Sequence, residues 1–407
     1  MSQATITDLL LAHNSGREPE RLAMKYSAMR KSAFVFLRGS CQLFHHRLAA
    51  EGLVPDAPAA WICGDLHMEN FGTYASGEGR TEGAKIQFDV NDFDEAILAA
   101  HTLDILRLAS SVFVGAETIG LDAGRPKEAA YRAITHYLGE LAGGRARSID
   151  RQSARGPIGD LIAKLGKRDL AKFVDKRTKR RDGRLVIDVD GDKALALDSR
   201  RRTRLAEFCS SLPPPEGRPR AFTFIDAARR IAGTGSLGIE RDVILVEGEG
   251  APRHWLLDLK AAHRTALADC VGAQPSYADE ARRVVEIQGL FQDATPALLG
   301  AHVLDGKAFV LKQMQPSADR LDLAAVASDG DAFDIVIDTM AHLTAWGHLR
   351  GSGHRGSADV GMLATSANRM GLADDILKRA AEMARITHAD FSAYARAYDD
   401  GRFGAVR

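Results

Sequence analysis

The sequence is poor in the features that mark secreted, membrane-spanning and metal-cluster proteins. No apolar run approaches the roughly 20 residues of a membrane-spanning helix, and residues 1–20 lack the basic and apolar regions of a secretory signal. Cysteine is scarce, and the four cysteines are too widely spaced to form a metal-binding pair. We therefore expect a cytoplasmic protein with reduced thiols. The cysteines are Cys41, Cys63, Cys209 and Cys270.

An excess of charge of either sign is also missing. The 54 Lys and Arg residues balance 54 Asp and Glu residues, so the whole chain has no electrostatic preference for nucleic acid or a membrane. A hydrophobic fraction of 45% with 27% charged residues excludes wholesale disorder. At roughly 150 residues per domain, the length allows two or three domains.

Hydrophobic periodicity predicts an α+β chain in which helices flank a strand-rich stretch. A glycine-rich turn is expected at 77–83. Helices are predicted at 34–48, with Ser32 as the cap, from Leu103 to Val112, at 277–291, and after Pro316, where Phe333 to Trp346 give the best apolar stripe. Strands are predicted at 59–63, at 86–90, before Gly233, and at 242–247, 254–260 and 307–313.

Residues 145–204 differ from the rest of the chain because they carry 19 Lys and Arg against 9 Asp and Glu. This pattern is typical of a solvated helical insertion, and a docking surface for an anionic or protein partner is the alternative. Only Phe173 interrupts the basic residues with an aromatic ring, which argues against a stacking platform for single-stranded nucleic acid. The stretch ends in an expected linker at 212–217, rich in proline.

The first chemical motif is the loop at 64–70, Gly-Asp-Leu-His-Met-Glu-Asn, which follows a predicted strand. Such a loop can aim Asp65 at an incoming hydroxyl group while the side-chain oxygen of Asn70 holds a divalent cation. A polar turn without function is the alternative.

The second motif, residues 89–95, places four carboxylates in seven positions. Mutual repulsion would raise their pKa values if no cation neutralised them. Alternation along an extended backbone puts Asp92 and Asp94 on the same side. We expect them to bind Mg²⁺ there. The alternative is an acidic surface turn.

The third motif is a glycine loop between two predicted strands. A lone GxGxxG pattern is weak, but strands on both sides favour a flap over ATP phosphates rather than a dinucleotide-binding turn. The candidate nucleotide-binding residues of this loop are Gly233, Thr234, Gly235, Ser236 and Gly238.

A lysine at the end of an apolar strand is the fourth feature. Lys260 lies on the opposite face from Trp255, Leu257 and Leu259 and could reach the phosphates below the flap. Its expected partner is a glutamate of the next helix. Glu280 is favoured by its helix face, and Glu286 is the alternative.

Together these motifs resemble those of aminoglycoside and choline kinases, but in a different order. The loop at 64–70 resembles their catalytic loop, residues 92–94 resemble their metal segment, and residues 104–108 resemble the helix that follows. The flap, the lysine strand and the helix come after these segments instead of before them. The resemblance therefore implies a circularly permuted, two-lobed kinase-like fold.

The order of the motifs and their residues also resemble those of a bacterial family of uncharacterised proteins grouped with the kinase-like fold. The resemblance extends from about Arg21 to Trp346 and rests on residues 32–39, 64–72, 88–96, 233–238 and 283–286.

Transferred to this sequence, the resemblance implies a role for each motif. Asp65 would be the catalytic base, and His67 would lie near the γ-phosphate. The loop departs from the pattern at Cys63, where these kinases have a bracing histidine. The resemblance further implies Mg²⁺ ligands at Asn70, Asp92 and Asp94, triphosphate binding by the flap and Lys260, and an adenine-binding hinge at Lys312, Gln313 and Met314.

The sequence thus predicts a Mg²⁺- and ATP-dependent phosphotransferase, with a small-molecule hydroxyl acceptor favoured over a protein. AMP transfer would use the same residues. One alternative is a nucleotide-binding regulatory protein without turnover. Another is a metallophosphoesterase, whose further motifs are missing. The expected parts are catalytic and metal loops of the large lobe at 1–144, the basic insertion and linker at 145–220, the small lobe at 221–316 and returning helices at 317–407.

Overall fold

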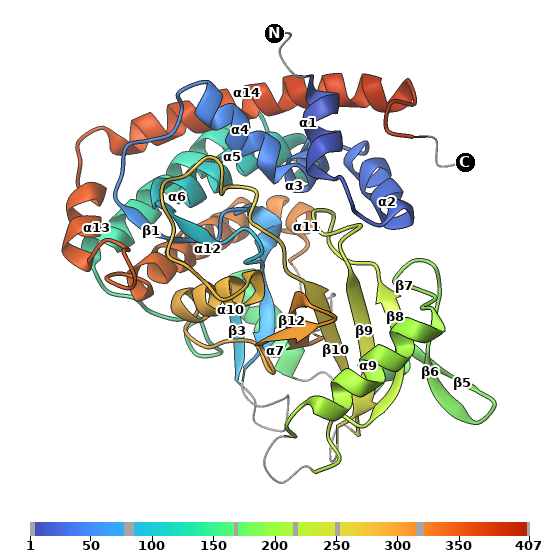
Figure 1. Ribbon diagram of the computed structural model, residues 1–407. Coiled ribbons are helices and arrows are strands. Elements are labelled where there is room, and N and C mark those ends of the chain that lie inside the picture. The colour runs from blue at the N-terminus through green and yellow to red at the C-terminus, as the bar shows by residue number, and fades with distance from the viewer. Residues whose placement is uncertain are drawn as a thin grey trace.

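A computed structural model describes residues 5–76, 85–166, 170–214, 219–248, 253–314 and 321–404. Within these residues a helical body stands beside a six-stranded antiparallel sheet (Figure 1). The expected α+β class is therefore confirmed. The expected turn at 77–83, part of the expected linker and the start of the last helical region lie outside the described residues.

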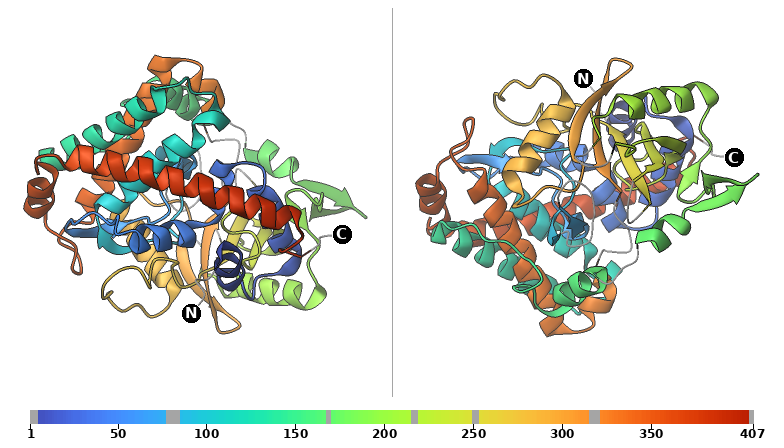
Figure 2. Two further views of the ribbon diagram at one scale, coloured as in Figure 1. Left: turned by 90° about the horizontal axis from the view of Figure 1, so that it is seen from above. Right: turned by 90° about the horizontal axis from the view of Figure 1, so that it is seen from below.

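The helical body is built around α5, most of whose residues are buried. Such a helix is apolar on most faces because other helices surround it. α6 and α14 pack against it, α12 packs against α6, and Figure 2 shows α14 running across the body. The helices in this part of the chain are α1 (Ile6–His13), α2 (Pro19–Met29), α3 (Ala33–Gly39), α4 (Cys41–Ala50), η1 (Met68–Asn70), α5 (Thr102–Ile119), α6 (Arg125–Gly143), α7 (Gly156–Gly166), α11 (Leu323–Ala327), α12 (Gly330–Arg350), α13 (Val360–Ala367) and α14 (Leu372–Asp399).

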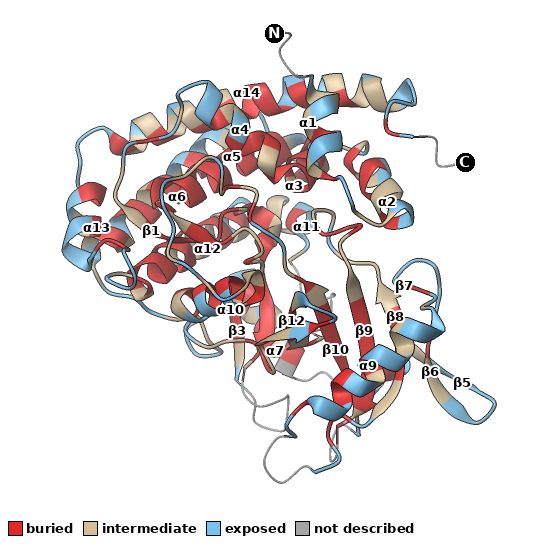
Figure 3. Cartoon of the chain, in the orientation of Figure 1, coloured by how far each residue is buried: buried red, intermediate tan, exposed pale blue. Residues whose placement is uncertain are grey.

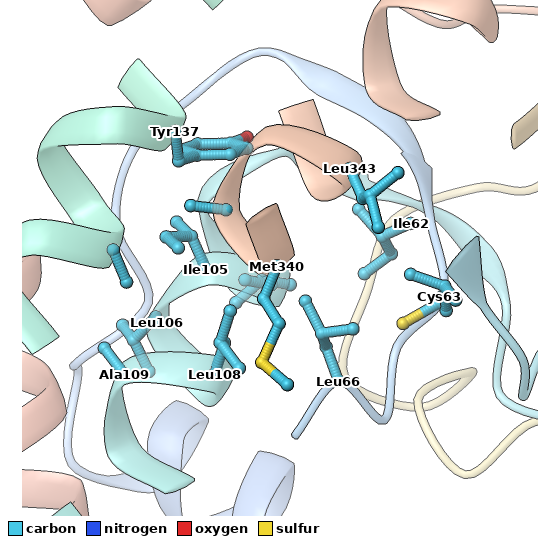
Figure 4. Close-up of a cluster of buried hydrophobic side chains, with 14 of the residues drawn as sticks. Ile62, Cys63, Leu66, Ile105, Leu106, Leu108, Ala109, Tyr137, Met340 and Leu343 are labelled. Atoms are coloured by element: carbon cyan, nitrogen blue, oxygen red, sulfur yellow. The ribbon is translucent and has the colours of Figure 1, made fainter. Parts of the chain in front are cut away.

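Two short strand pairs flank the loops at residues 63–70 and 91–96. β1 (Ala59–Ile62) pairs with β4 (Ile97–Ala100), and β2 (Phe71–Ala75) pairs with β3 (Ile86–Val90). Figure 4 shows apolar side chains of β1, α5 and α12 meeting directly behind the loop that follows β1. The loop is therefore anchored on a packed core.

The six-stranded sheet has the order β11-β12-β10-β9-β8-β7. α10 lies between sheet and body, because it contacts β11 and β12 as well as α12 and β1. Figure 3 shows buried central strands and an exposed hairpin, β5 with β6. The elements are α8 (Leu170–Asp175), β5 (Thr178–Arg181), β6 (Arg184–Ile187), β7 (Ala194–Leu195), α9 (Ser199–Ser211), β8 (Phe224–Arg230), β9 (Arg241–Glu247), β10 (His254–Ala261), α10 (Glu280–Phe291), β11 (Gly300–Leu304) and β12 (Lys307–Gln313).

The two faces of the sheet have different environments. On one face Trp255, Leu257 and Leu259 of β10 pack against α9. On the other face the apolar contacts of α8 and β6 cover only part of β10. The rest of that face carries Asp258 and Lys260, since side chains alternate along a strand.

The basic segment does not stand apart from the fold. β7 is the edge strand of the six-stranded sheet, and α9 covers one face of it. The strand-rich part of the chain therefore begins before residue 221. Burial of Leu205 and Phe208 at spacing three explains why this charged segment folds onto the sheet.

The prediction of one continuous helix at 34–48 is wrong. Residues 34–48 form two helices, which meet at Ser40 with φ −133° and ψ 45°. Gly39 lies so close to Met29 that a Cβ there would be 2.5 Å from its side chain. The cap is confirmed, since the Ser32 side chain accepts a hydrogen bond from the Val35 N–H at 3.2 Å.

None of the described helices is long and apolar enough to cross a membrane. All four cysteines lie among the described residues and are free thiols, as expected.

Candidate functional site

The loop after β1 is held from behind by Asp104 of α5. Its carboxylate accepts hydrogen bonds from the N–H groups of Cys63 at 2.9 Å and Gly64 at 3.0 Å. His348 of α12 contacts the same carboxylate at 3.2 Å, and His45 contacts the Gly64 carbonyl at 2.8 Å. These groups brace the loop where Cys63 replaces the expected histidine.

Asp65 reaches forward from this loop and is paired with Arg107 of α5. The Arg107 Nε donates to Asp65 Oδ1 at 2.9 Å, and a second nitrogen of Arg107 binds the same oxygen. Burial raises the pKa of Asp65, and the Arg107 guanidinium opposes this effect. Because Arg107 is fully buried, it fixes the carboxylate in one position.

Asn70, Asp92 and Asp94 lie on two neighbouring loops. The Asn91 N–H donates to the Asn70 carbonyl at 2.8 Å, which joins the loops. The Asn70 amide nitrogen donates to the Asp65 carbonyl, which leaves the Asn70 side-chain oxygen available. Asp92 Oδ1 accepts a hydrogen bond from the Asp94 N–H at 3.3 Å, and the Asp92 carboxylate forms no ion pair within the described residues.

The oxygens of Asn70, Asp92 and Asp94 could hold one hard cation only if a bound ligand completed its coordination shell. No group of three or more His, Cys, Asp or Glu side chains in the described part of the chain could hold a metal. Mg²⁺ normally takes one or two carboxylates and completes its shell with water and substrate phosphates. Asp92, Asp94 and Asn70 all line one cavity and carry oxygens of the type that such a site uses.

The glycine loop between β8 and β9 is clamped by α2 and the turn that precedes it. Arg17 donates to the carbonyls of Gly235 at 2.7 Å and Leu237 at 3.0 Å. Buried Lys25 donates to the Gly235 carbonyl at 3.2 Å. In a planar trans peptide the next N–H points the opposite way from the carbonyl. The N–H groups of Ser236 and Gly238 therefore point away from the clamp.

Lys260 is paired with Asp94, not with a glutamate of α10. The prediction of a helical partner is wrong in this structure. Glu280 pairs with Arg283 at 2.6 Å, and Glu286 pairs with Arg355 at 2.6 Å. The helix face toward Lys260 is occupied by Val284 and Gln288, which line the same cavity.

This ion pair changes the acidity of Asp94. Burial raises the pKa of Asp94, but the Lys260 ammonium more than offsets it, so the pKa lies below its usual value. The next residue, Glu95, forms no ion pair within the described residues, and burial raises its pKa to about 6.

Two cavities meet at these residues. An inner cavity of about 320 Å³ lies between the sheet and the two loops and is lined by Asn70, Gly233, Lys260 and Met314. An outer cavity of about 1020 Å³ is lined by Asp65, Gly235 and Gly238. Asp92, Asp94, Ser236 and Val284 line both cavities. The acidic loop and the glycine loop therefore form the junction.

His67 does not fit the catalytic role expected for it. It is buried, lines neither cavity, and packs its ring edge-on against Phe34 at 6.1 Å. Its Nδ1 accepts a hydrogen bond from the Glu69 N–H at 3.1 Å, which caps η1. Its position is therefore explained by capping and packing.

The expected hinge also differs from the prediction. The Gln313 N–H donates to the Ala297 carbonyl and the Met314 N–H to the Leu256 carbonyl, both at 2.8 Å. These two N–H groups are already used by the fold and are not available to an adenine ring. Thr234 and Gln313 line neither cavity.

Several residues of the site were not singled out from the sequence. No spacing pattern indicates Arg17 and Lys25, because they are more than 200 residues from the glycine loop in the sequence. Arg230 and Arg241 were missed because their role depends on Asp258, with which both form ion pairs at 2.5 Å. Lys312 was expected only in the hinge, but it lines the inner cavity on the same face of β12 as Val310.

The comparisons with known proteins identify a family. The model of a family described as an uncharacterised protein conserved in bacteria, DUF2252, matches residues 17–397. No curated protein and no solved structure matches the chain. The matched range includes the clamp at Arg17, both loops, the sheet and the last long helix. The chain therefore belongs to the bacterial family DUF2252.

Proposed function

We propose that the protein is a Mg²⁺- and ATP-dependent phosphotransferase with a small-molecule hydroxyl acceptor. The observation that carries this proposal is the meeting of two cavities at Asp92, Asp94 and Ser236. One substrate could occupy each cavity, and the transferred group would lie between them. Holding two reactants in this way converts a bimolecular reaction into a step within one complex.

The roles follow from what lines each cavity. Asp65 faces the outer cavity, where it could orient an acceptor hydroxyl and take its proton. Asn70, Asp92 and Asp94 could hold Mg²⁺, which would neutralise charge on the phosphates. The N–H groups of the glycine loop would add hydrogen bonds to the same phosphates.

The order of elements around the sheet also supports the proposal. The glycine loop joins β8 to β9, the lysine is on β10, and α10 follows, which is the order of these parts in protein kinases. The catalytic-type loop and the acidic loop precede them, and α12 and α14 return to the helical body. A circularly permuted kinase-like fold would have this path.

One observation favours the alternative of a nucleotide binder without turnover. Burial raises the pKa of Asp65, but the ion pair with buried Arg107 opposes this rise, so Asp65 is a weaker base than it would be without Arg107. Turnover would then require Asp65 to act chiefly by orienting the hydroxyl group.

A thermal-shift titration with ATP tests the proposal, with and without Mg²⁺. A ligand that binds only the folded state raises the midpoint by mass action. We expect a Mg²⁺-dependent shift in the wild type that is lost in Lys260→Ala. The control is Lys127→Ala, whose exposed lysine lines neither cavity. The proposal fails if ATP gives no shift in the wild type.

A further inference from the structure

A chain of hydrogen bonds runs through the core behind the loop that follows β1. It begins at Ser366 of α13, whose hydroxyl oxygen lies 2.8 Å from His101 Nε2. His101 Nδ1 lies 2.8 Å from the Tyr137 hydroxyl oxygen, and the same oxygen lies 2.8 Å from His348 Nδ1. His348 Nε2 lies 3.2 Å from Oδ2 of Asp104. The chain therefore joins α13, α6 and α12 to the carboxylate that binds the loop.

The hydroxyl group of Tyr137 decides where the protons of this chain lie. It can donate only one hydrogen bond, and it donates to the His101 carbonyl oxygen at 2.9 Å, because a carbonyl oxygen can only accept. The two imidazole nitrogens at 2.8 Å must therefore donate to the hydroxyl oxygen. Nδ1 of His101 and Nδ1 of His348 thus each carry a proton.

The two histidines differ in what faces their other ring nitrogen. His101 Nε2 faces the Ser366 hydroxyl group, which can donate to it. Burial lowers the pKa of His101 to about 3, so this ring is neutral and carries its one proton on Nδ1. His348 Nε2 faces a carboxyl oxygen of Asp104, so that contact needs a further proton, on one side or the other.

This further proton belongs to His348 and not to Asp104. Both carboxylate oxygens of Asp104 accept backbone hydrogen bonds, from the Cys63 N–H at 2.9 Å and the Gly64 N–H at 3.0 Å. Such bonds favour the ionised form of a carboxyl group. His348 is then an imidazolium ion that donates from both nitrogens, in an ion pair whose two side chains are fully buried.

His348 also supports the acidic loop. Its ring packs edge-on against Phe291 of α10 at 5.6 Å, and Phe291 packs edge-on against Phe93 at 5.3 Å. Phe93 is the buried centre of residues 92–94. α12 can approach this closely because of Gly347, where a Cβ would lie 2.1 Å from the Phe291 ring. One side chain of α12 therefore contacts the supports of both loops.

We propose that His348 is a positively charged positioning residue, which holds the loop at 63–65 through Asp104 and the acidic loop through Phe291. Asp65 follows Gly64 directly, so fixing the Gly64 N–H limits where the Asp65 carboxylate can point. A reacting group needs such support behind it to keep one geometry. The consequence for phosphotransfer rests on the proposed function, whereas the charge of His348 and its hold on the loop do not.

Nitrogen NMR of the full chain with labelled histidine tests the charge. At about pH 8 an exposed histidine is neutral, since its usual pKa is about 6.5. We expect one histidine whose two ring nitrogens are both protonated, and we expect its signal to be missing from His348→Gln. A wild-type spectrum in which every histidine has a single protonated nitrogen would overturn the inference without any variant. A doubly protonated signal that persists in His348→Gln would overturn it as well.

Hydrogen exchange of backbone amides tests the positioning. His348→Leu removes the donor to Asp104, so the N–H groups of Cys63 and Gly64 should exchange roughly tenfold faster than in the wild type. His348→Gln keeps an N–H donor and should restore part of the protection. The matched control is His388→Leu, since His388 is exposed on α14 and lines neither cavity. Unchanged exchange at the two amides, or equally faster exchange throughout α5 and α12, contradicts the positioning role.

Turnover separates the inference from the proposed function. In His348→Leu the Mg²⁺-dependent affinity for ATP should stay within about twofold, while phosphoryl transfer to water should slow roughly tenfold. His348 lines neither cavity, and leucine keeps the apolar contact with Phe291. An equal loss of affinity and transfer contradicts the inference. If ATP does not bind the wild type, the proposed function is wrong, and NMR and hydrogen exchange still decide the inference.

Discussion

The Lys260 ammonium pairs with the Asp94 carboxylate and so ties the six-stranded sheet to the acidic loop of the helical body. The lysine side chain is 11% exposed and the aspartate side chain is 34% exposed. The pair therefore lies at the edge of the inner cavity, where a ligand can reach both groups. In the proposed complex, Lys260 would exchange Asp94 for a phosphate group, and Asp94 would exchange Lys260 for Mg²⁺.

Lys260→Met should reduce the free energy of unfolding by about 1–3 kcal/mol, because Asp94 loses its counter-charge in a partly buried place. Lys260→Met combined with Asp94→Asn should recover most of this loss. Urea unfolding of the two single variants and the double variant measures the coupling. Additive effects would show that the pair is absent in solution. Mg²⁺-dependent ATP binding should be lost in all three variants.

Asp92→Asn should abolish the Mg²⁺ dependence of ATP binding without destabilising the protein. Asp92 has no ion pair within the described residues, and its charge raises the pKa of Asp65, so removing it relieves repulsion. Thermal-shift titrations with ATP, with and without Mg²⁺, give the measurement. The control is Asp122→Asn, an exposed carboxylate outside both cavities. An unchanged Mg²⁺ dependence would remove Asp92 from the cation site.

Arg17→Ala should weaken ATP binding roughly tenfold, which corresponds to about 1.4 kcal/mol. Arg17 orients the glycine loop by binding the carbonyls of Gly235 and Leu237, so its loss allows the peptides to rotate. Calorimetric titration gives the affinity, and a thermal scan shows whether the fold is intact.

The matched control for Arg17→Ala is Arg30→Ala. Arg30 forms an exposed ion pair with Asp399 at 2.8 Å and lines neither cavity. Such exposed pairs contribute little to stability. Equal ATP affinities for the two variants would show that the clamp does not order the loop.

The predictions that succeeded rest on local pattern. The strands at 59–63 and 86–90 and the helix containing Phe333 to Trp346 follow from apolar spacing, and the structure forms them. The predictions that failed depend on distant contacts. The partner of Lys260 is set by how the acidic loop meets β10, across 166 residues of sequence.

The same distinction holds within single motifs. The loop at 64–70 could be recognised from its residue types. The burial of His67 against Phe34 could not be predicted from them. The prediction of one continuous helix at 34–48 was wrong. Gly39 closely approaches Met29 at the break, and hydrophobic periodicity does not encode that contact. The basic segment was expected to be solvated, yet a few apolar residues in α9 were sufficient to fold it onto the sheet.

Asp89→Asn should stabilise the protein at neutral pH and remove part of its pH dependence. Asp89 is a buried residue of β3, and within the described residues it has one ion pair, a long one of 3.9 Å with Arg350. Burial raises the pKa of Asp89 to about 7. An unfolded aspartate titrates near 3.9, so the folded state holds an additional proton between about pH 4 and pH 7.

Because the folded state binds more protons in that range, wild-type stability falls as the pH rises from about 4 to 7. About three pKa units correspond to a loss of up to about 4 kcal/mol from this group. Asparagine does not titrate, so the difference in unfolding free energy between Asp89→Asn and wild type should grow with pH and level off above pH 7. Urea unfolding from pH 4.5 to 8, with Asp122→Asn as the control, measures it. A difference that stays constant with pH would show that Asp89 is already ionised in the folded protein at low pH, and that Arg350 balances its burial.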